Sequence, residues 1–112
     1  MREDGKIDYV ELPGGDLVAT RRFYEAAFGW TFTNYGPAYT AFHEGLDGGF
    51  NADAADQADK ALVILYAKDL EVMEAKVRAG GGAITRPIFA FPGGRRFHFR
   101  DPSGNELAVW SE

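Results

Sequence analysis

A repeat with a period of 53 residues restricts the possible folds of this chain more than any other feature of its sequence. The pair Asp16-Leu17 recurs as Asp69-Leu70, and Gly29 recurs as Gly82, in each case 53 residues further along the chain. In both halves a strand pattern precedes the aspartate, apolar residues at helical spacing follow it, and glycine ends the helix. The sequence therefore predicts a duplicated βαβββ unit of about 50 residues, with two helices of equal length.

The first half begins with a strand whose side chains alternate between two faces. Val10 and Leu12 lie on one face of residues 7–12, while Tyr9 and Glu11 lie on the other. The aspartate and glycine of this half are placed as the N-cap and the C-terminal stop of a helix. Turn residues then separate three further strands, which are expected at 30–33, 39–43 and 50–52, with turns at 34–37 and at Asp47-Gly48-Gly49.

The second half repeats this order. Residues 61–67 form an almost continuous apolar strand, Asp69 is placed as an N-cap, and Gly80-Gly81-Gly82 closes the helix. Three strands follow, at 83–86, 95–100 and 106–110. These boundaries predict a single domain over residues 1–112, with repeat one at about 7–52, a linker at about 53–60 and repeat two at about 61–110.

The composition excludes several classes of function. With 12 basic and 17 acidic residues the net charge is −5, which disfavours binding to nucleic acid. The chain has no cysteine, so disulfides, thiolate metal sites and cysteine nucleophiles are impossible. No apolar run resembles a signal peptide or a membrane span, so we expect a cytoplasmic protein without a membrane partner.

Two local motifs add a family resemblance to the repeat. Phe23-Tyr24 is followed by Phe28-Gly29-Trp30 in the first helix, and the run 101–107 (DPSGNEL) forms a turn before the last strand. Together with the repeat, these motifs resemble the vicinal oxygen chelate superfamily, which contains glyoxalases, bleomycin resistance proteins and dioxygenases. The likeness covers residues 7–110 and is greatest to short proteins related to lactoylglutathione lyase.

The resemblance implies an α+β fold in which two βαβββ repeats form a cupped, eight-stranded mixed sheet with helices on the outer face. The ligand would lie on the concave face. Metal-dependent members of the superfamily place one ligand on the first and last strand of each unit. Those positions correspond here to Tyr9, Leu62, Ala108 and a point near Ala52, with Asn51 as the only nearby donor.

This set of residues predicts that no metal and no other cofactor is bound. Divalent transition metals require imidazole or carboxylate ligands at several points. Leucine and alanine have no donor atom, and a tyrosine is a poor ligand for these ions. We therefore expect the superfamily's usual metal to be absent.

The candidate site residues follow from the faces of the predicted strands. Glu11 is a candidate general base or hydrogen-bond acceptor, or else an exposed edge carboxylate. His98 shares a strand face with Arg96 and Arg100, which suits proton transfer or binding of an anion, although a solvated polar face would explain the same pattern. The expected ligand-binding residues are Tyr9, Glu11, Leu62, Tyr66, Arg96, His98, Arg100, Ala108 and Trp110, with Glu11 and His98 as the catalytic candidates.

Three functions remain open at this point. The favoured one is a small-molecule binding protein of the bleomycin-resistance type, which binds in an aromatic cup without metal. The alternative is a glyoxalase-like lyase, isomerase or dioxygenase that holds a metal at relocated ligands. A structural or interaction domain is the third. We also expect a homodimer, because a chain of 112 residues with many aromatic side chains leaves apolar surface to cover.

Overall fold

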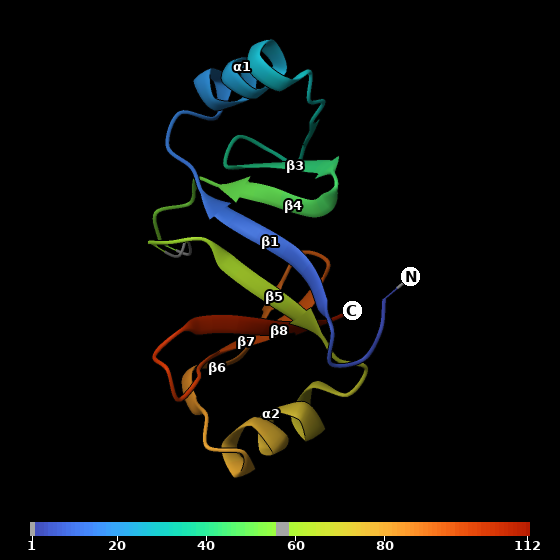
Figure 1. Cartoon of the computed structure of the whole chain (residues 1–112), viewed down its shortest axis with the longest axis vertical. Coiled ribbons are helices and arrows are strands. Elements are labelled where there is room, and N and C mark those ends of the chain that lie inside the picture. The colour runs from blue at the N-terminus through green and yellow to red at the C-terminus, as the bar shows by residue number, and fades with distance from the viewer. Residues whose placement is uncertain (1, 56–58) are drawn as a thin grey trace. The chain divides into compact units, whose positions relative to one another are not determined.

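The computed structural model describes residues 2–55 and 59–112, and the chain divides into two compact units. The N-terminal unit comprises Tyr9–Leu62, and the C-terminal unit comprises Val63–Glu112 together with the first residues of the chain up to Asp8. Part of the predicted linker, residues 56–58, lies outside the described residues. The described residues contain eight strands and two helices, so the α+β class predicted from the sequence is confirmed (Figure 1).

The N-terminal unit combines one helix with a mixed sheet. Its strand order is β2-β3-β4-β1, in which β1 runs parallel to β4 and the other neighbours are antiparallel. The side chain of Asp16 accepts a hydrogen bond from the N–H of Ala19, and Gly29 ends the helix at a φ of 73°. Both caps are as predicted. The elements are β1 (Ile7–Pro13), α1 (Leu17–Phe28), β2 (Thr33–Asn34), β3 (Tyr39–Glu44) and β4 (Leu46–Asn51).

Aromatic side chains form the core of the N-terminal unit. Leu17, Phe42 and Phe50 are buried, and the rings of Tyr24 and Trp30 stack with their centroids 4.7 Å apart. Val10 and Leu12 of β1 pack against this cluster, as the alternation of the strand predicts. One face of the sheet therefore packs against α1 through apolar side chains.

The glycine pair Gly48-Gly49 lies inside β4, and the turn predicted there is wrong. The reversal between β3 and β4 occurs instead at Gly45, whose φ is 93°. Rings from β3 cross the backbone of β4 at both glycines. A Cβ added at Gly48 would lie 2.7 Å from Cε1 of Phe42, and one at Gly49 would lie 2.6 Å from Cε1 of Tyr39. These glycines serve close packing rather than a turn.

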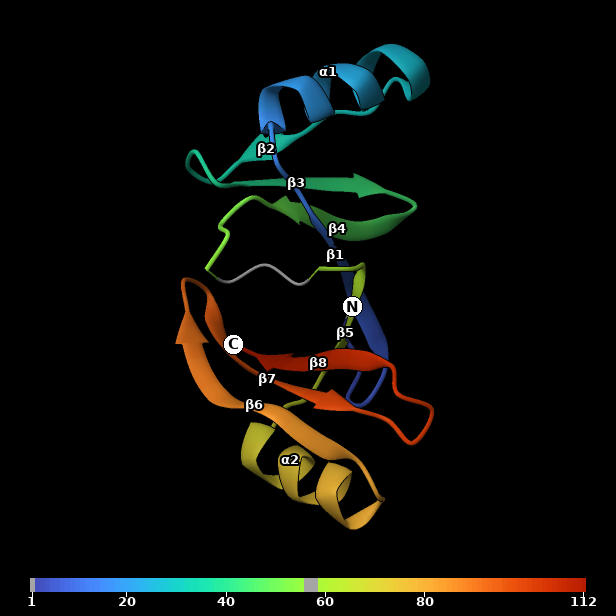
Figure 2. The same ribbon diagram turned by 90° about the vertical axis from the view of Figure 1, so that its left-hand side faces the viewer.

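The C-terminal unit has the same order of elements. Its strand order is β5-β8-β7-β6, with β5 parallel to β8 and the other neighbours antiparallel. Figure 2 shows α2 beside the β6, β7 and β8 strands, with which it is in contact. The elements are β5 (Leu62–Tyr66), α2 (Leu70–Ala79), β6 (Ala83–Phe91), β7 (Gly94–Arg100) and β8 (Glu106–Ser111).

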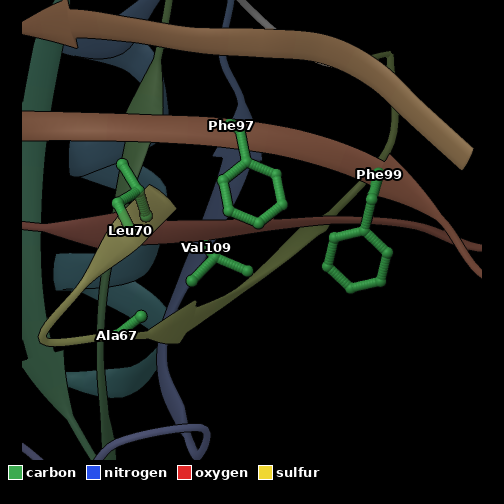
Figure 3. Close-up of a cluster of buried hydrophobic side chains, with 5 residues drawn as sticks. All are labelled: Ala67, Leu70, Phe97, Phe99 and Val109. Atoms are coloured by element: carbon green, nitrogen blue, oxygen red, sulfur yellow. The ribbon is translucent and has the colours of Figure 1, made fainter. Parts of the chain in front are cut away.

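The core of this unit lies between α2 and one face of the strands. Its buried side chains, drawn in Figure 3, are Ala67, Leu70, Phe97, Phe99 and Val109. Leu70 is the first residue of α2, and its buried side chain anchors the start of the helix. Phe97 and Phe99 thus lie on the core side of β7.

Two expectations for the C-terminal unit need correction. The helices differ in length, because α2 ends at Ala79 and is capped by Gly80, which gives ten residues against twelve in α1. In addition, β6 continues past the predicted end at Arg86 to Phe91, through Pro87. Proline lacks a backbone N–H, and this is tolerated because β6 is an edge strand. The pairing of β6 with β7 is irregular near Pro87.

Candidate functional site

In each unit the strands have a face turned away from the core, and the polar candidates lie on that face. We call it the helix-free face. On β1, Tyr9 and Glu11 alternate with the core-packed Val10 and Leu12. On β7, Arg96 and His98 alternate with Phe97 and Phe99. Buried polar groups need hydrogen-bond partners. The hydrogen bonds on these two faces therefore show which polar atoms already have a partner.

On the helix-free face of the N-terminal unit, two phenols and a carboxylate form a tyrosine–glutamate cluster. The hydroxyl of Tyr39 donates to Oε1 of Glu11 at 3.3 Å, and the hydroxyls of Tyr9 and Tyr39 lie 2.6 Å apart. Glu11 is only 5% exposed. Since the proton of Tyr39 is directed to the carboxylate, Tyr9 supplies the proton of the bond between the phenols.

The protonation state of the two phenols follows from their burial. Burial raises the pKa of Tyr9 to about 12, and it raises the pKa of Tyr39 further. Both phenols therefore remain protonated near neutral pH and serve as hydrogen-bond donors. Tyr39 was not a predicted site residue; it reaches Glu11 across β4 because Gly49 has no side chain.

On the helix-free face of the C-terminal unit, an imidazole faces a carboxylate. Nδ1 of His98 lies 3.4 Å from Oε2 of Glu106, and Oγ1 of Thr85 donates to the same oxygen at 3.1 Å. Within the described residues, Nε2 of His98 is buried and has no hydrogen-bond partner. Burial, and next the charge of Arg96, lowers the pKa of His98, so the ring is neutral at neutral pH.

Arginines and phenylalanines surround this histidine. The ring centroid of Phe89 lies 5.7 Å from that of His98. The guanidinium of Arg96, a residue that is 5% exposed, lies 5.5 Å from the ring centroids of both Phe89 and Phe91, and that of Arg86 lies 3.7 Å from Phe89. Phe89 and Phe91 were missed from the sequence, because β6 was expected to end before Pro87. Arg86 lies within the predicted strand but was not assigned to the site.

The other candidates in this unit are distributed more widely. Ala108 is fully buried and lies directly opposite His98 in the register of β7 and β8, and Trp110 lies opposite Arg96. Nε1 of Trp110 donates to Asp8 at 2.9 Å. The hydroxyl of Tyr66 donates to Glu112 at 2.7 Å. Trp110 thus forms a hydrogen bond with the N-terminal segment, and Tyr66 forms one with the last residue.

Arg100 takes no part in the group around His98. Its side chain donates to the carbonyl oxygen of Gly104 at 3.0 Å, within the turn before β8, and it is exposed. His43 is paired with Asp47, and its side chain is 83% exposed. The structure therefore brings together Arg96 and His98 but leaves Arg100 outside.

The residues at the superfamily's metal positions do not fit a metal. Leu62 and Ala108 are buried and have no donor atom, and Tyr9 remains a neutral phenol. Near the fourth position, Oδ1 of Asn51 accepts a hydrogen bond from the N–H of Asp53 at 2.9 Å. The part of the chain that the structure describes contains no group of three or more His, Cys, Asp or Glu side chains that could hold a metal ion.

Comparison with known proteins identifies the family. The model of the glyoxalase/bleomycin resistance protein/dioxygenase superfamily matches residues 6–109, so the chain belongs to this superfamily. This confirms the resemblance inferred from the sequence. No curated protein matches the chain. No helix in residues 2–55 and 59–112 has the length and apolar character needed to cross a membrane.

Solved structures agree with this assignment at the level of the fold. An NAD-dependent benzaldehyde dehydrogenase from Legionella pneumophila superposes with a TM-score of 0.78 at 14% identity, over 92% of this chain and 96% of that one. A superfamily member from Vibrio splendidus gives 0.70 at 12% identity, over 96% and 99%. Methylmalonyl-CoA epimerase from Mycobacterium tuberculosis gives 0.70 at 12%, over 96% and 87%. At these identities the similarity shows the fold alone.

Proposed function

We propose that this protein binds a small organic molecule without a metal ion, on the helix-free face of the C-terminal unit. The observation that carries the proposal is that Nε2 of His98, a residue only 4% exposed, has no hydrogen-bond partner among the described residues. A buried polar atom without a partner costs about 1–3 kcal/mol. A ligand that bonds to this nitrogen would remove that cost.

The surroundings of His98 suit an apolar molecule with few polar groups. The ring of Phe89 lies beside the imidazole, and Ala108 opposite it contributes only a methyl group. Ligand sites commonly combine aromatic surface with a small number of placed polar atoms. Arg96, whose guanidinium lies near the rings of Phe89 and Phe91, adds a positive charge on the same strand face.

Fold relatives give this proposal a general precedent. One structure similar to this chain is a methylmalonyl-CoA epimerase in complex with methylmalonyl-CoA and NH4+, with a TM-score of 0.67 at 17% identity, covering 98% of this chain and 96% of that one. That protein binds a small organic molecule. The alternative for this chain, a lyase, isomerase or dioxygenase with a metal at relocated ligands, has no supporting cluster of donor side chains in the described residues.

We propose in addition that the protein acts as a homodimer in the cytoplasm. Phe28, with 64% of its surface exposed, and Phe23 leave aromatic rings of α1 open to solvent, which an interface would cover. Light scattering at tens of micromolar protein tests this proposal. A monomeric mass would contradict it.

Native mass spectrometry of protein purified without chelator tests the binding proposal. We expect a bound organic molecule that denaturation releases, and no stoichiometric transition metal by elemental analysis. One equivalent of tightly bound iron, nickel, zinc or manganese would contradict metal-free binding. His98→Asn should reduce the fraction of protein that carries the molecule, whereas His43→Asn on the exposed β3–β4 hairpin should not.

A further inference from the structure

We infer that His98 selects a ligand by its hydroxyl group: Nε2 of His98 accepts a hydrogen bond, and the bound molecule donates it through an O–H. This inference rests on the proposed function, since it specifies the chemical class of the ligand at the same site. It depends on which nitrogen of His98 carries the proton, and the neighbours of the ring decide that.

The carboxylate of Glu106 places the proton on Nδ1. An ionised carboxylate only accepts hydrogen bonds. Oε2 of Glu106 lies 3.4 Å from Nδ1 of His98, and Thr85 donates to this same oxygen and thereby holds the carboxylate in place. Nδ1 must therefore act as the donor in its contact with Glu106.

A neutral imidazole has only one N–H, so the other nitrogen carries a lone pair. Burial and the neighbouring charge of Arg96 disfavour a second proton on His98. Nε2 is consequently an acceptor, and within the described residues it is buried and unpartnered. The group that meets it has to be a donor.

The positive charges of Arg96 and Arg86 outnumber the negative charge of Glu106 near the ring, which favours a neutral donor. An ammonium group would lie near Arg96, whose positive charge also opposes protonation of the imidazole. A carboxylate, ionised at neutral pH, has no proton to donate and would place its lone pairs against that of Nε2. An alcohol or phenol hydroxyl meets both conditions, and its carbon skeleton can pack against the ring of Phe89.

The first part of the test measures the tautomer without any ligand. The chain has two histidines, so His43→Asn leaves His98 as the only imidazole. Long-range ¹H–¹⁵N correlation spectra near neutral pH are expected to show a protonated Nδ1 and an unprotonated Nε2. A protonated Nε2, or a charged ring at this pH, would overturn the inference.

The second part compares pairs of probes that differ only in the donor: phenol with anisole, and cyclohexanol with methoxycyclohexane. For at least one pair we expect the hydroxyl compound to bind at least about tenfold more tightly than its methyl ether, equivalent to about 1.4 kcal/mol. Binding of the hydroxyl compound should also shift the Nε2 resonance of His98. Equal affinities within both pairs would overturn the inference.

Variants separate this inference from the proposed function. His98→Phe should abolish the preference for the hydroxyl compound, whereas His43→Phe should preserve it; loss of the preference in both variants would contradict a role for His98. If no probe binds, the hydroxyl inference fails. The proposed function fails only if native mass spectrometry also finds no bound molecule.

Discussion

The two units share their order of elements but differ in the hydrogen bonding of the polar groups on the helix-free face. In the N-terminal unit the buried carboxylate of Glu11 accepts a hydrogen bond from Tyr39, which is bonded in turn to Tyr9. In the C-terminal unit the network of Thr85, Glu106 and His98 ends at a buried nitrogen that has no partner within residues 2–55 and 59–112. Both phenols of the first cluster have a hydrogen-bond partner, whereas the second network has, among the residues that the structure describes, an acceptor without one.

This difference indicates that two units with the same topology can have different roles, one in stability and one in binding. A network whose hydrogen bonds are all internal stabilises the sheet that contains it. A network with an unsatisfied buried atom costs stability, and such a cost is typical of binding sites. We therefore propose a structural role for the tyrosine–glutamate cluster beside the proposed binding role of His98, and substitutions can test each proposal.

The largest effect is expected at Gly49. In Gly49→Val the new side chain would meet the ring of Tyr39, which cannot move without leaving Glu11. We expect the free energy of unfolding to fall by about 3 kcal/mol, as overpacking at a tight contact does. Urea denaturation measures it. Gly15→Ala, where an added Cβ has no neighbour within 4 Å, is the control and should change stability little.

Tyr39→Phe should have the next largest effect. The substitution preserves the ring over Gly49 but removes the hydroxyl that donates to Glu11. Loss of this partner should lower the free energy of unfolding by about 1–2 kcal/mol. Tyr35→Phe, on a tyrosine that is largely exposed, is the matched control. Equal free energies of unfolding for the two variants would show that the cluster does not stabilise the N-terminal unit.

The pH dependence of stability should report on His98. The pKa of His98 is lowered in the folded protein, so below the ordinary value of 6.5 the unfolded chain binds the proton more readily. Stability should therefore decrease as the pH falls from above 6.5 towards the folded pKa, with no further loss from this group below it. Denaturation curves of the parent and of His98→Phe would show the difference, which should vanish if His98 is charged in the folded state.

The smallest effect is expected at an ion pair in the C-terminal unit. Nη1 of Arg95 lies 2.6 Å from Oε2 of Glu71 on α2, and both side chains are substantially exposed. Solvent screening limits such pairs to about 0.2–1 kcal/mol. Arg95→Ala should thus change thermal stability only slightly, and less so at high salt. A loss as large as that of Tyr39→Phe would contradict this ranking.

The sequence predicted those features that depend on local patterns. The caps Asp16 and Asp69 each accept the expected hydrogen bond from a backbone N–H. Alternation also separated Tyr9 and Glu11 from the core side of β1, and His98 from the core side of β7. Short polar side chains before helices and a period of two in strands carry this information locally.

The missing site residues depend on contacts that no local pattern encodes. Gly48-Gly49 resembles a turn until the rings that cross it from β3 are known. Pro87 resembles a strand end, although Phe89 and Phe91 alternate beyond it on a continuing strand. Glu106 was not a predicted site residue, since its contact with His98 depends on the pairing of β7 with β8.

The glycine pair in β4 also bears on how the N-terminal unit acquires its pairing during folding. Phe42 lies opposite Gly48, and Ala41 lies opposite Gly49. If β3 and β4 shifted by one residue, the ring of Phe42 would meet Asp47 in one direction, and the ring of Tyr39 would meet Phe50 in the other. Every side chain of β4 would also exchange faces relative to β3. The pair would therefore favour the observed register of the β3–β4 hairpin over a shifted one by steric exclusion.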